Sequence, residues 1–234
     1  MARDVGVVIP AAGRGTRLGK RQAKAFVLVA GQPLLLHTLR AFQRAPSVHA
    51  MVVVAPPSDQ RRVESLVRRH RCTKVVAVVA GADSRAGSVV KGLAVLPATV
   101  KWVAIHDGAR PCVTPRLIDM LVRKAKQHGA VAAGLPAGLT VKAVDEAQRV
   151  RLTLDREQLW LVQTPQVFRR EWIMDAVSRA NGHLEHFPDD AAILEWAGFP
   201  VQMVPGDPSN IKVTTPHDLA MAEVILRNGR AHSA

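Results

Sequence analysis

The chain has 234 residues, 48% of them hydrophobic, and a formal net charge of +13. This length is enough for one large domain whose core needs no disulfide or metal to fold. The only cysteines, Cys72 and Cys112, lie far apart and outside any CxxC or Cys/His cluster, which argues against a zinc site or a disulfide framework. We therefore expect a protein of the reducing cytoplasm.

The sequence also bears on membrane and nucleic-acid partners. No apolar run approaches the roughly 18 residues that a spanning helix needs, and no signal peptide precedes the first strand-like run, so we expect a soluble protein. The excess of 32 Lys and Arg over 19 Asp and Glu favours anionic partners in general. The densest basic run, residues 60–71, has the spacing of an amphipathic helix with a solvated arginine face and no interleaved aromatic residues. We do not expect nucleic acid as a partner.

Short β-branched runs alternate with helical patterns from residue 5 to residue 136. This alternation predicts an α/β fold, a Rossmann-like, mostly parallel sheet with helices on both faces. We expect strands at residues 5–10, 49–55, 74–80, 102–107 and 130–136. Helices are expected at about 33–44, 58–70, 84–96 and 115–128, with a last helix that begins at Thr215 and Pro216. Thr114 and Pro115 have the same Thr-Pro pattern, which favours a helix N-terminus.

Between residues 137 and 165 the alternation stops, and residues 139–144 and 150–155 have the pattern of a two-stranded hairpin. An isolated hairpin is marginally stable in water, so we expect this arm to pack on a second subunit of a homodimer. The predicted organisation is a nucleotide-binding core at 1–136, an arm for dimerisation and acceptor binding at 137–165, the remainder of the core at 166–228 and a flexible tail at 229–234.

The loop after the first strand is rich in small residues: Ala11, Ala12, Gly13 and Gly15. In an open parallel sheet, ligands bind outside the carboxyl ends of the strands, and small residues let backbone amides approach a phosphate closely. The spacing fits neither a dinucleotide GxGxxG loop nor a Walker A loop. A simple strand-to-helix turn is the alternative, but the cations that crowd this loop favour a polyphosphate ligand: Arg17, Lys20, Arg21 and Lys24.

Two further loops are expected at the same edge of the sheet. Residues 81–88 contain Asp83 or Ser84 as a helix N-cap, and their amides are suited to a base or ribose; a capped helix start without a ligand is the alternative. In residues 106–111, Asp107 can meet a ribose hydroxyl or Mg²⁺ and Arg110 a phosphate, with a surface ion pair as the alternative. His106 is interpreted as a packed residue at a strand end.

Six segments occur in order across nearly the whole chain: "PAAGRGTRLGKRQAK", "GADSRAGSV", "HDGARP", "LDREQLW", "TPQVF" and "NIKVTTPHDLAMAE". Together they closely resemble the 2-C-methyl-D-erythritol 4-phosphate cytidylyltransferase family of the non-mevalonate isoprenoid pathway. The resemblance implies that CTP and methylerythritol phosphate are joined to CDP-methylerythritol with release of pyrophosphate. It also implies Mg²⁺, bound mainly through the CTP phosphates, and a homodimer whose arm reaches the partner's active site.

The resemblance also implies site residues. Arg17 and Lys24 match the cations that stabilise the transition state, and Arg156 and Lys212 match the residues that position the attacking phosphate. The positions that match the nucleotide site are Pro10, Ala11, Ala12, Gly13, Gly15, Gly81, Asp83, Ser88, Asp107 and Gly108. Supporting contacts to the acceptor are implied for Arg110, Thr140 and Thr164, and no metal ligand is assigned beyond the possibility of Asp107.

Three departures from the family pattern bear on the acceptor and on Lys24. Alanines flank Lys24 where the family has Pro and Gln, Leu139 replaces an acid before the arm threonine, and Pro188 replaces a threonine before Asp189 and Asp190. Two alternatives therefore stay open: a cytidylyltransferase for another sugar-alcohol phosphate such as ribitol phosphate, and a non-catalytic basic binding protein on the same fold.

Overall fold

The computed structural model describes residues 4–13, 23–180 and 182–231. Within them a seven-stranded sheet has the order β11-β7-β10-β6-β1-β4-β5. Its strands are β1 (Val5–Pro10), β4 (Val48–Ala55), β5 (Val75–Ala80), β6 (Trp102–Ile105), β7 (Ala130–Pro136), β10 (Trp160–Arg169) and β11 (Gln202–Pro205). β1 pairs in parallel with β4 and β6, whereas β10 is antiparallel to both β6 and β7. The predicted mostly parallel α/β fold is confirmed.

The structure differs from the predicted elements in several respects, among them two helices that were not predicted, at residues 170–179 and 190–196. β10 and β11 were not predicted, and β10 is the strand that separates β6 from β7 in the sheet. β6 ends at Ile105 and not at residue 107, because His106 and Asp107 turn out of the sheet into the loop that carries the site. The five predicted helices are present with ends that differ by a few residues.

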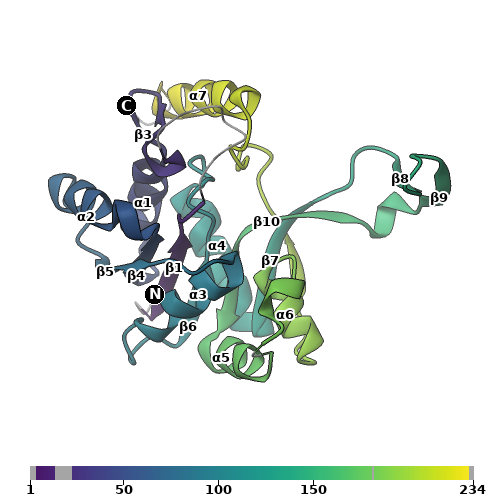
Figure 1. The fold of residues 1–234 in the computed structure, drawn as a ribbon, viewed down its shortest axis with the longest axis horizontal. Coiled ribbons are helices and arrows are strands. Elements are labelled where there is room, and N and C mark those ends of the chain that lie inside the picture. The colour runs from purple at the N-terminus through teal and green to yellow at the C-terminus, as the bar shows by residue number, and fades with distance from the viewer. Residues whose placement is uncertain (1–3, 14–22, 181, 232–234) are drawn as a thin grey trace.

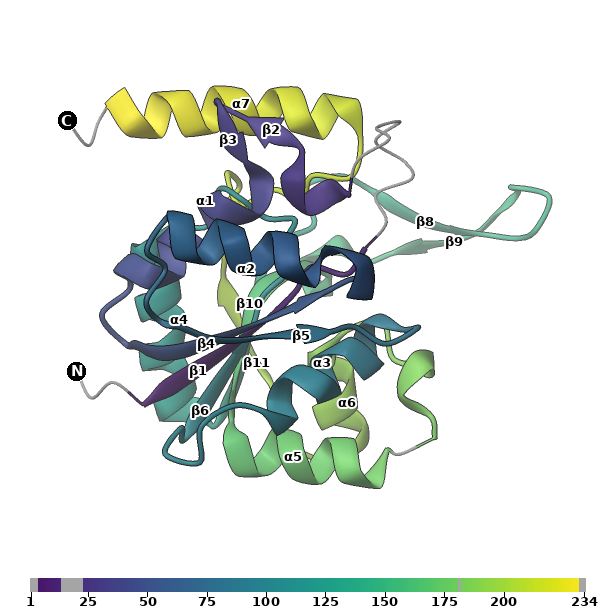
Figure 2. The same cartoon turned by 60° about the vertical axis from the view of Figure 1, so that its left-hand side comes forward.

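Side chains of successive strand residues point to opposite faces of the sheet, which therefore has two cores. Val7 and Ile9 of β1 belong to one core and Val8 to the other. The first core is covered by α1 (Leu34–Arg44), α2 (Gln60–Arg69) and α4 (Pro115–His128). The second is covered by α3 (Arg85–Ala94), α5 (Arg170–Arg179) and α6 (Asp190–Trp196). Figure 2 shows these two layers on either side of the strands.

The last helix, α7 (Pro216–Ala231), packs in a third, smaller core against β2 (Leu28–Val29), which pairs with β3 (Gln32–Pro33) (Figure 2). The predicted Thr-Pro helix starts are confirmed. Thr114 Oγ1 accepts from the amide of Leu117, and Thr215 Oγ1 accepts from the amide of Asp218. Short 3-10 turns are η2 (Lys24–Phe26), η3 (Pro57–Asp59), η4 (Arg156–Gln158) and η5 (Leu184–His186).

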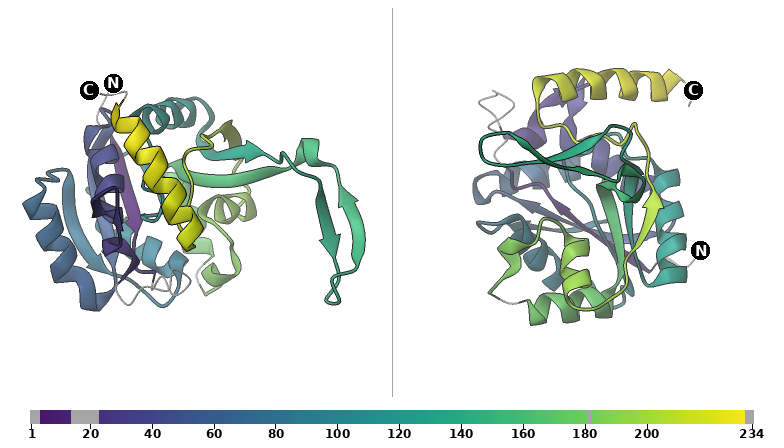
Figure 3. Two further views of the ribbon diagram at one scale, coloured as in Figure 1. Left: turned by 90° about the horizontal axis from the view of Figure 1, so that it is seen from above. Right: turned by 90° about the vertical axis from the view of Figure 1, so that its right-hand side faces the viewer.

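The arm is a hairpin of β8 (Val141–Val144) and β9 (Val150–Leu154), which projects away from the sheet (Figures 1 and 3). β10 joins it to the core, since Trp160 pairs with Pro136 and the strand then continues through residue 165 into the sheet. The arm exposes several large apolar side chains: Leu139, Val144, Val150, Leu152 and Leu161.

Among the helices of the described residues, none combines the length and the apolar character needed to cross a lipid bilayer.

Candidate active site

A cavity of about 460 Å³ lies at the carboxyl ends of β1, β5 and β6. Its walls come from residues 10–13 after β1, residues 82–88 after β5 and residues 107–109 after β6. Lys24 of η2 and Lys212, which follows β11, also line the cavity, together with Ala25, Leu34 and Thr214. The position agrees with the general rule for ligands of open α/β sheets, and the volume is in the usual range for small-molecule sites, roughly 300–1,000 Å³.

Backbone hydrogen bonds hold the three loops of the cavity together. The Ala11 amide donates to Val54 O at 2.7 Å, the Gly81 amide to Ala55 O at 2.8 Å and the Gly108 amide to Pro10 O at 3.1 Å. These amides belong to the scaffold. Ala11 and Gly108 thus shape the wall of the cavity, but their amides are already bonded within the protein. A ligand would bind to other backbone amides of these loops.

The first two loops touch at Gly81. A Cβ atom at this glycine would lie 2.7 Å from the Cβ of Ala12 and 3.2 Å from Ser88 Oγ, which is too close for a side chain. Ser88 Oγ in turn accepts from the Ala82 amide at 3.0 Å, and Ser84 caps α3 through the Gly87 amide. The helix start therefore fixes the loop that follows β5, in the place where the sequence predicted a nucleotide contact.

Asp107 is the centre of the charges in this cavity. Its Oδ1 accepts from Arg85 Nε at 3.2 Å, and its Oδ2 lies 2.7 Å from Lys212 Nζ and 3.9 Å from Arg110 Nε. Burial alone would raise the pKa of the Asp107 carboxyl, but the Arg85, Lys212 and Arg110 cations outweigh burial and hold this pKa well below its usual range. Asp107 is therefore an anion throughout the neutral pH range.

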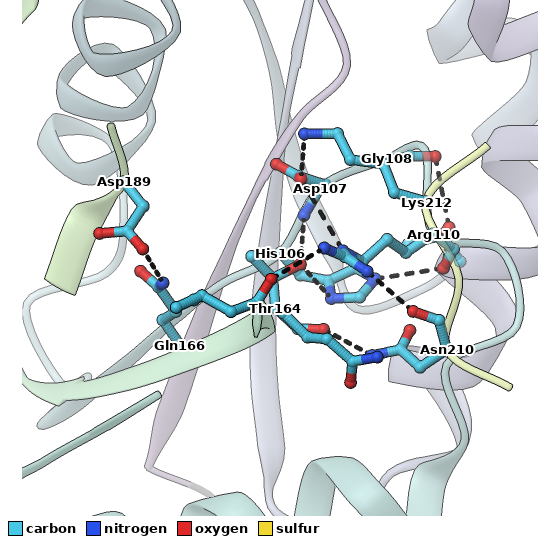
Figure 4. A network of polar contacts seen from close by, with 12 residues as sticks. His106, Asp107, Gly108, Arg110, Thr164, Gln166, Asp189, Asn210 and Lys212 are labelled. Carbon is cyan, nitrogen blue, oxygen red and sulfur yellow. Dashed lines mark hydrogen bonds and ion pairs between the residues drawn. The ribbon is translucent and has the colours of Figure 1, made fainter. Parts of the chain in front are cut away.

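His106 is completely buried beside Asp107, and its hydrogen bonds define its tautomer (Figure 4). Nε2 lies 3.2 Å from the carbonyl oxygen of Arg110, which can only accept, so Nε2 carries the proton. The Thr164 hydroxyl accepts from the Asp107 amide and donates to His106 Nδ1, each at 3.1 Å. Burial lowers the pKa of His106 to about 4. The ring is thus a neutral structural element, as the sequence indicated.

Arg110 connects the loop after β6 to the segment that carries Lys212. Its Nη1 donates to the carbonyl oxygen of Asn210 at 2.8 Å, and the Val213 amide donates to Ala109 O at 2.9 Å. Asn210 is fully buried and donates through Nδ2 to Thr164 O at 2.7 Å (Figure 4). Lys212 is therefore held by backbone contacts on both of its sides, and Arg110 lies under the cavity as part of this support.

The structure brings most of the expected site residues together. Those that line the cavity are Pro10, Ala11, Ala12, Gly13, Lys24, Asp83, Ser88, Asp107, Gly108 and Lys212. Gly81, Arg110 and Thr164 lie directly behind them. Gly15 and Arg17 lie outside the described residues.

Two expected residues lie elsewhere. Thr140 precedes β8, and Arg156 opens η4, where its Nη1 donates to Gly138 O at 3.3 Å. Both side chains are exposed on the arm and neither lines the cavity.

Sequence reasoning missed Arg85 and Asp190. Arg85 Nη2 donates to Asp190 Oδ2 at 2.7 Å while its Nε contacts Asp107. Arg85 belongs to the segment "GADSRAGSV" and Asp190 to the acidic pair after Pro188. Both lie in segments that the sequence analysis singled out, but their wide separation in the chain gave no sign that they are in contact.

The arrangement does not suit Asp107 as a ligand of Mg²⁺. Both of its oxygens already face cations, and a divalent ion would have to displace at least one of them. In the ranges that the structure describes, no group of three or more His, Cys, Asp or Glu side chains is placed to hold a metal ion.

Comparison with known proteins decides the family. The family model described as "IspD: 2-C-methyl-D-erythritol 4-phosphate cytidylyltransferase" matches residues 5–228. The chain belongs to this family. It is thus a nucleotidyltransferase, and the reaction of its family joins CTP and 2-C-methyl-D-erythritol 4-phosphate in the non-mevalonate route to isoprenoid precursors.

Individual relatives of this cytidylyltransferase agree with the family match. The chain is 39% identical over 225 residues to the 2-C-methyl-D-erythritol 4-phosphate cytidylyltransferase of Desulforamulus reducens, with 96% of each chain covered. It is 43% identical over 227 residues to a bifunctional enzyme IspD/IspF of Desulforudis audaxviator, covering 97% of this chain and 57% of that protein. The crystal structure of the cytidylyltransferase from Thermus thermophilus has a TM-score of 0.79 at 32% identity, with 96% of this chain and 99% of that chain covered.

Proposed function

We propose that the cavity of this cytidylyltransferase binds CTP and that the phosphate of 2-C-methyl-D-erythritol 4-phosphate attacks it there. The observation that supports this most directly is the cavity itself, which has Lys24 and Lys212 in its lining around the loops after β1, β5 and β6. In this proposal residues 10–13, Gly15, Gly81, Asp83 and Ser88 hold the nucleotide, and Asp107 with Gly108 faces the ribose. A cation pair in a partly enclosed cavity is suited to a polyphosphate.

The reaction needs no covalent intermediate with the protein. An oxygen of the acceptor phosphate forms a bond to the α-phosphorus of CTP while the bond from that phosphorus to the pyrophosphate oxygen breaks. Negative charge accumulates on the equatorial oxygens and on the leaving group, and cations placed there stabilise the transition state. We assign this role to Lys24 and Arg17, and we assign the positioning of the acceptor phosphate to Lys212 and Arg156.

The residues assigned to the acceptor differ in exposure and in the bonds that they already make. The Thr164 hydroxyl already bonds to Asp107 and His106, and Arg110 is buried against the Asn210 carbonyl. We therefore propose that Thr164 and Arg110 support the acceptor site from below and that Lys212, whose side chain is 43% exposed, contacts the acceptor directly.

Mg²⁺ enters this proposal with the nucleotide. Asp107 is occupied by cations, so we propose that the ion arrives bound to the triphosphate oxygens of CTP, where it neutralises charge. The residues of the cavity then bind the complex of CTP and metal as one substrate.

We further propose a homodimer in which the arm of each subunit reaches the cavity of the other. Thr140 and Arg156 lie on the arm and away from the cavity of their own chain, and the arm exposes Val150 and Leu152 to 60% and 57%. A partner surface would cover these side chains and bring Arg156 to an acceptor phosphate. Cys72 and Cys112 are buried and not joined in a disulfide, which is consistent with the proposed cytoplasmic location.

Release of pyrophosphate tests the proposed function. The assay uses CTP with methylerythritol phosphate and, separately, with ribitol phosphate, and replaces CTP by UTP and ATP as controls. We expect pyrophosphate release only when CTP is combined with methylerythritol phosphate, and not with ribitol phosphate, UTP or ATP. Preference for ribitol phosphate would assign a different acceptor, and no turnover together with salt-sensitive nucleic-acid binding would favour a non-catalytic binding protein.

A further inference from the structure

Asp190, the first residue of α6, has a buried carboxylate that the proposed reaction does not use. Its side chain is 0% exposed, its Oδ2 accepts from Arg85 Nη2 at 2.7 Å, and its Oδ1 has no hydrogen-bond partner among the described residues. Burial raises the pKa of this carboxyl. A buried ion pair is weak evidence for stability, because desolvation of the two charges offsets much of their attraction. Its presence beside the cavity therefore calls for a different explanation.

Arg85 joins this carboxylate to the cavity. The guanidinium bridges Asp190 and Asp107, and the other oxygen of Asp107 meets Lys212 Nζ at 2.7 Å. The result is an ion chain of alternating charge, defined here as Asp190, Arg85, Asp107 and Lys212. It begins at α6, passes the first turn of α3 and ends at the lysine on the acceptor side; Figure 4 shows the contact of Asp107 with Lys212.

The far end of the ion chain is fixed from the sheet. Gln166 of β10 accepts from the Ala191 amide and donates to Asp189 Oδ2, both at 3.0 Å. Asp189 Oδ1 caps α6 through the Ala192 amide at 2.9 Å. These contacts hold the backbone on both sides of Asp190, so its carboxylate offers Arg85 a rigid anchor (the bond between Gln166 and Asp189 is visible in Figure 4).

We propose that Asp190 is a positioning residue for the transfer reaction, which acts by fixing Arg85, through Arg85 the carboxylate plane of Asp107, and through Asp107 the Lys212 ammonium. This inference rests on the proposed role of Lys212. A guanidinium held by two carboxylates has little freedom to rotate. Without Asp190, Arg85 can turn toward the triphosphate, and Asp107 loses the contact that directs its second oxygen at Lys212.

Replacement of the buried carboxylate by its neutral isostere tests the proposal. We expect Asp190→Asn to lower kcat/KM for the acceptor by about 10- to 100-fold, the order of loss that follows from a small misplacement of reacting groups. The matched control is Asp4→Asn, which removes the carboxylate of the 2.7 Å ion pair between Asp4 and Lys126, outside the lining of the cavity. The control is expected to stay within about twofold of the wild type. Equal activity of the two variants would overturn the proposal.

A double-mutant cycle separates positioning from a general structural effect. In a Lys212→Gln background the last cation of the ion chain is absent. The further change Asp190→Asn should then lower kcat/KM by less than about twofold. Losses that multiply would show that Asp190 acts without Lys212 and would overturn the inference. Full activity of Lys212→Gln alone would instead contradict the proposed role of Lys212.

A second variant covers the case in which Asp190→Asn does not fold. Arg85→Lys keeps the positive charge at a partly exposed side chain, but an ammonium cannot bridge both carboxylates in the same geometry. We expect a loss in kcat/KM similar to that of Asp190→Asn, with the thermal unfolding midpoint of each variant recorded alongside. A fully active Arg85→Lys enzyme would contradict the bridge.

Discussion

The Lys212 ammonium lies 2.7 Å from Asp107 Oδ2, and it is the most exposed of the three cations around that carboxylate, with 43% of its side chain exposed against 32% for Arg85 and 11% for Arg110. In the protein without substrate, the charge of Asp107 is thus shared among three cations. An acceptor phosphate can approach the exposed side of Lys212 while Asp107 Oδ2 continues to hold the ammonium, and Arg85 and Arg110 compensate the rest of the Asp107 charge.

Removal of the Asp107 charge should therefore affect both folding and turnover. In Asp107→Asn the three cations face one another without a central anion, and loss of one partner of a buried ion pair typically costs about 3–5 kcal/mol of unfolding free energy. We expect a loss of this order in urea unfolding, together with kcat/KM reduced by more than about tenfold. The control Asp4→Asn, at a partly exposed pair, should lose no more than about 1 kcal/mol. Equal stability of the two variants would contradict the central place of Asp107.

Gly81 should tolerate no side chain. In Gly81→Ala the new Cβ would meet the Cβ of Ala12 at 2.7 Å, so the loops after β1 and β5 must move apart. We expect the dissociation constant of CTP, measured by calorimetry, to rise by at least about tenfold, which corresponds to about 1.4 kcal/mol. Gly229→Ala on α7 has nothing within 4 Å of the new atom and should bind CTP as the wild type does. Unchanged CTP affinity in Gly81→Ala would place the nucleotide elsewhere.

His106 should make stability depend on pH in a defined window. Its folded pKa of about 4 lies below the usual 6.5, so between these values the unfolded state binds more protons and stability rises with pH. The stabilisation is complete above pH 6.5 and is lost as the pH falls toward 4, by about 3 kcal/mol in total. Asp107 contributes to stability as well, but because its pKa is lowered from 3.8 its contribution is lost only below that pH.

The free energy of unfolding measured from pH 4 to pH 7 tests this assignment. In His106→Gln, an amide can still donate to the Arg110 carbonyl but does not titrate. The rise in unfolding free energy between pH 4 and pH 6.5 should therefore be smaller than in the wild type by about 3 kcal/mol. Identical slopes in the two proteins would show that His106 does not titrate in this window.

The apolar side chains of the arm should be needed for dimerisation. Leu152 is 57% exposed in the single chain, and in Leu152→Lys a charge would have to be buried against the partner, which is unfavourable. We expect sedimentation equilibrium to show dissociation to a monomer with little activity. Val224→Lys, at a 53% exposed position on α7, is the control and should remain a dimer. A dimeric, active Leu152→Lys enzyme would contradict the proposed interface.

The sequence predicted β1, β4, β5, β6 and β7, because each is a short, mostly apolar run that alternates with a helical pattern. β10 was missed for a physical reason: Pro165 interrupts its pattern, and proline normally excludes a central strand. In the structure the register of β10 against β7 shifts between Val162 and Gln166, which accommodates this proline. β11 and α6 have four and seven residues and are too short for periodicity to reveal.

Some residues of the candidate site could likewise be predicted from the sequence and others could not. Residues in the loops after β1, β5 and β6 were predictable, because parallel strands bring their carboxyl ends to one edge. The contact of Arg85 with Asp190 was not, since it joins the first residues of α3 and α6, which lie 105 positions apart in the chain. The support that Thr164 gives to Asp107 through a hydrogen bond, and Arg110 through an ion pair, likewise depends on contacts between segments far apart in the chain or across the loop after β6.

The most direct test of the catalytic assignment is the single-turnover rate of CDP-methylerythritol formation by Lys24→Ala at saturating CTP, with Lys101→Ala as a control at an exposed lysine outside the cavity lining. If Lys24 stabilises the transition state, the rate falls by about 100- to 1,000-fold while the affinity for CTP changes far less, and Arg17→Ala behaves alike. A Lys24→Ala rate within about twofold of the wild type would contradict the account.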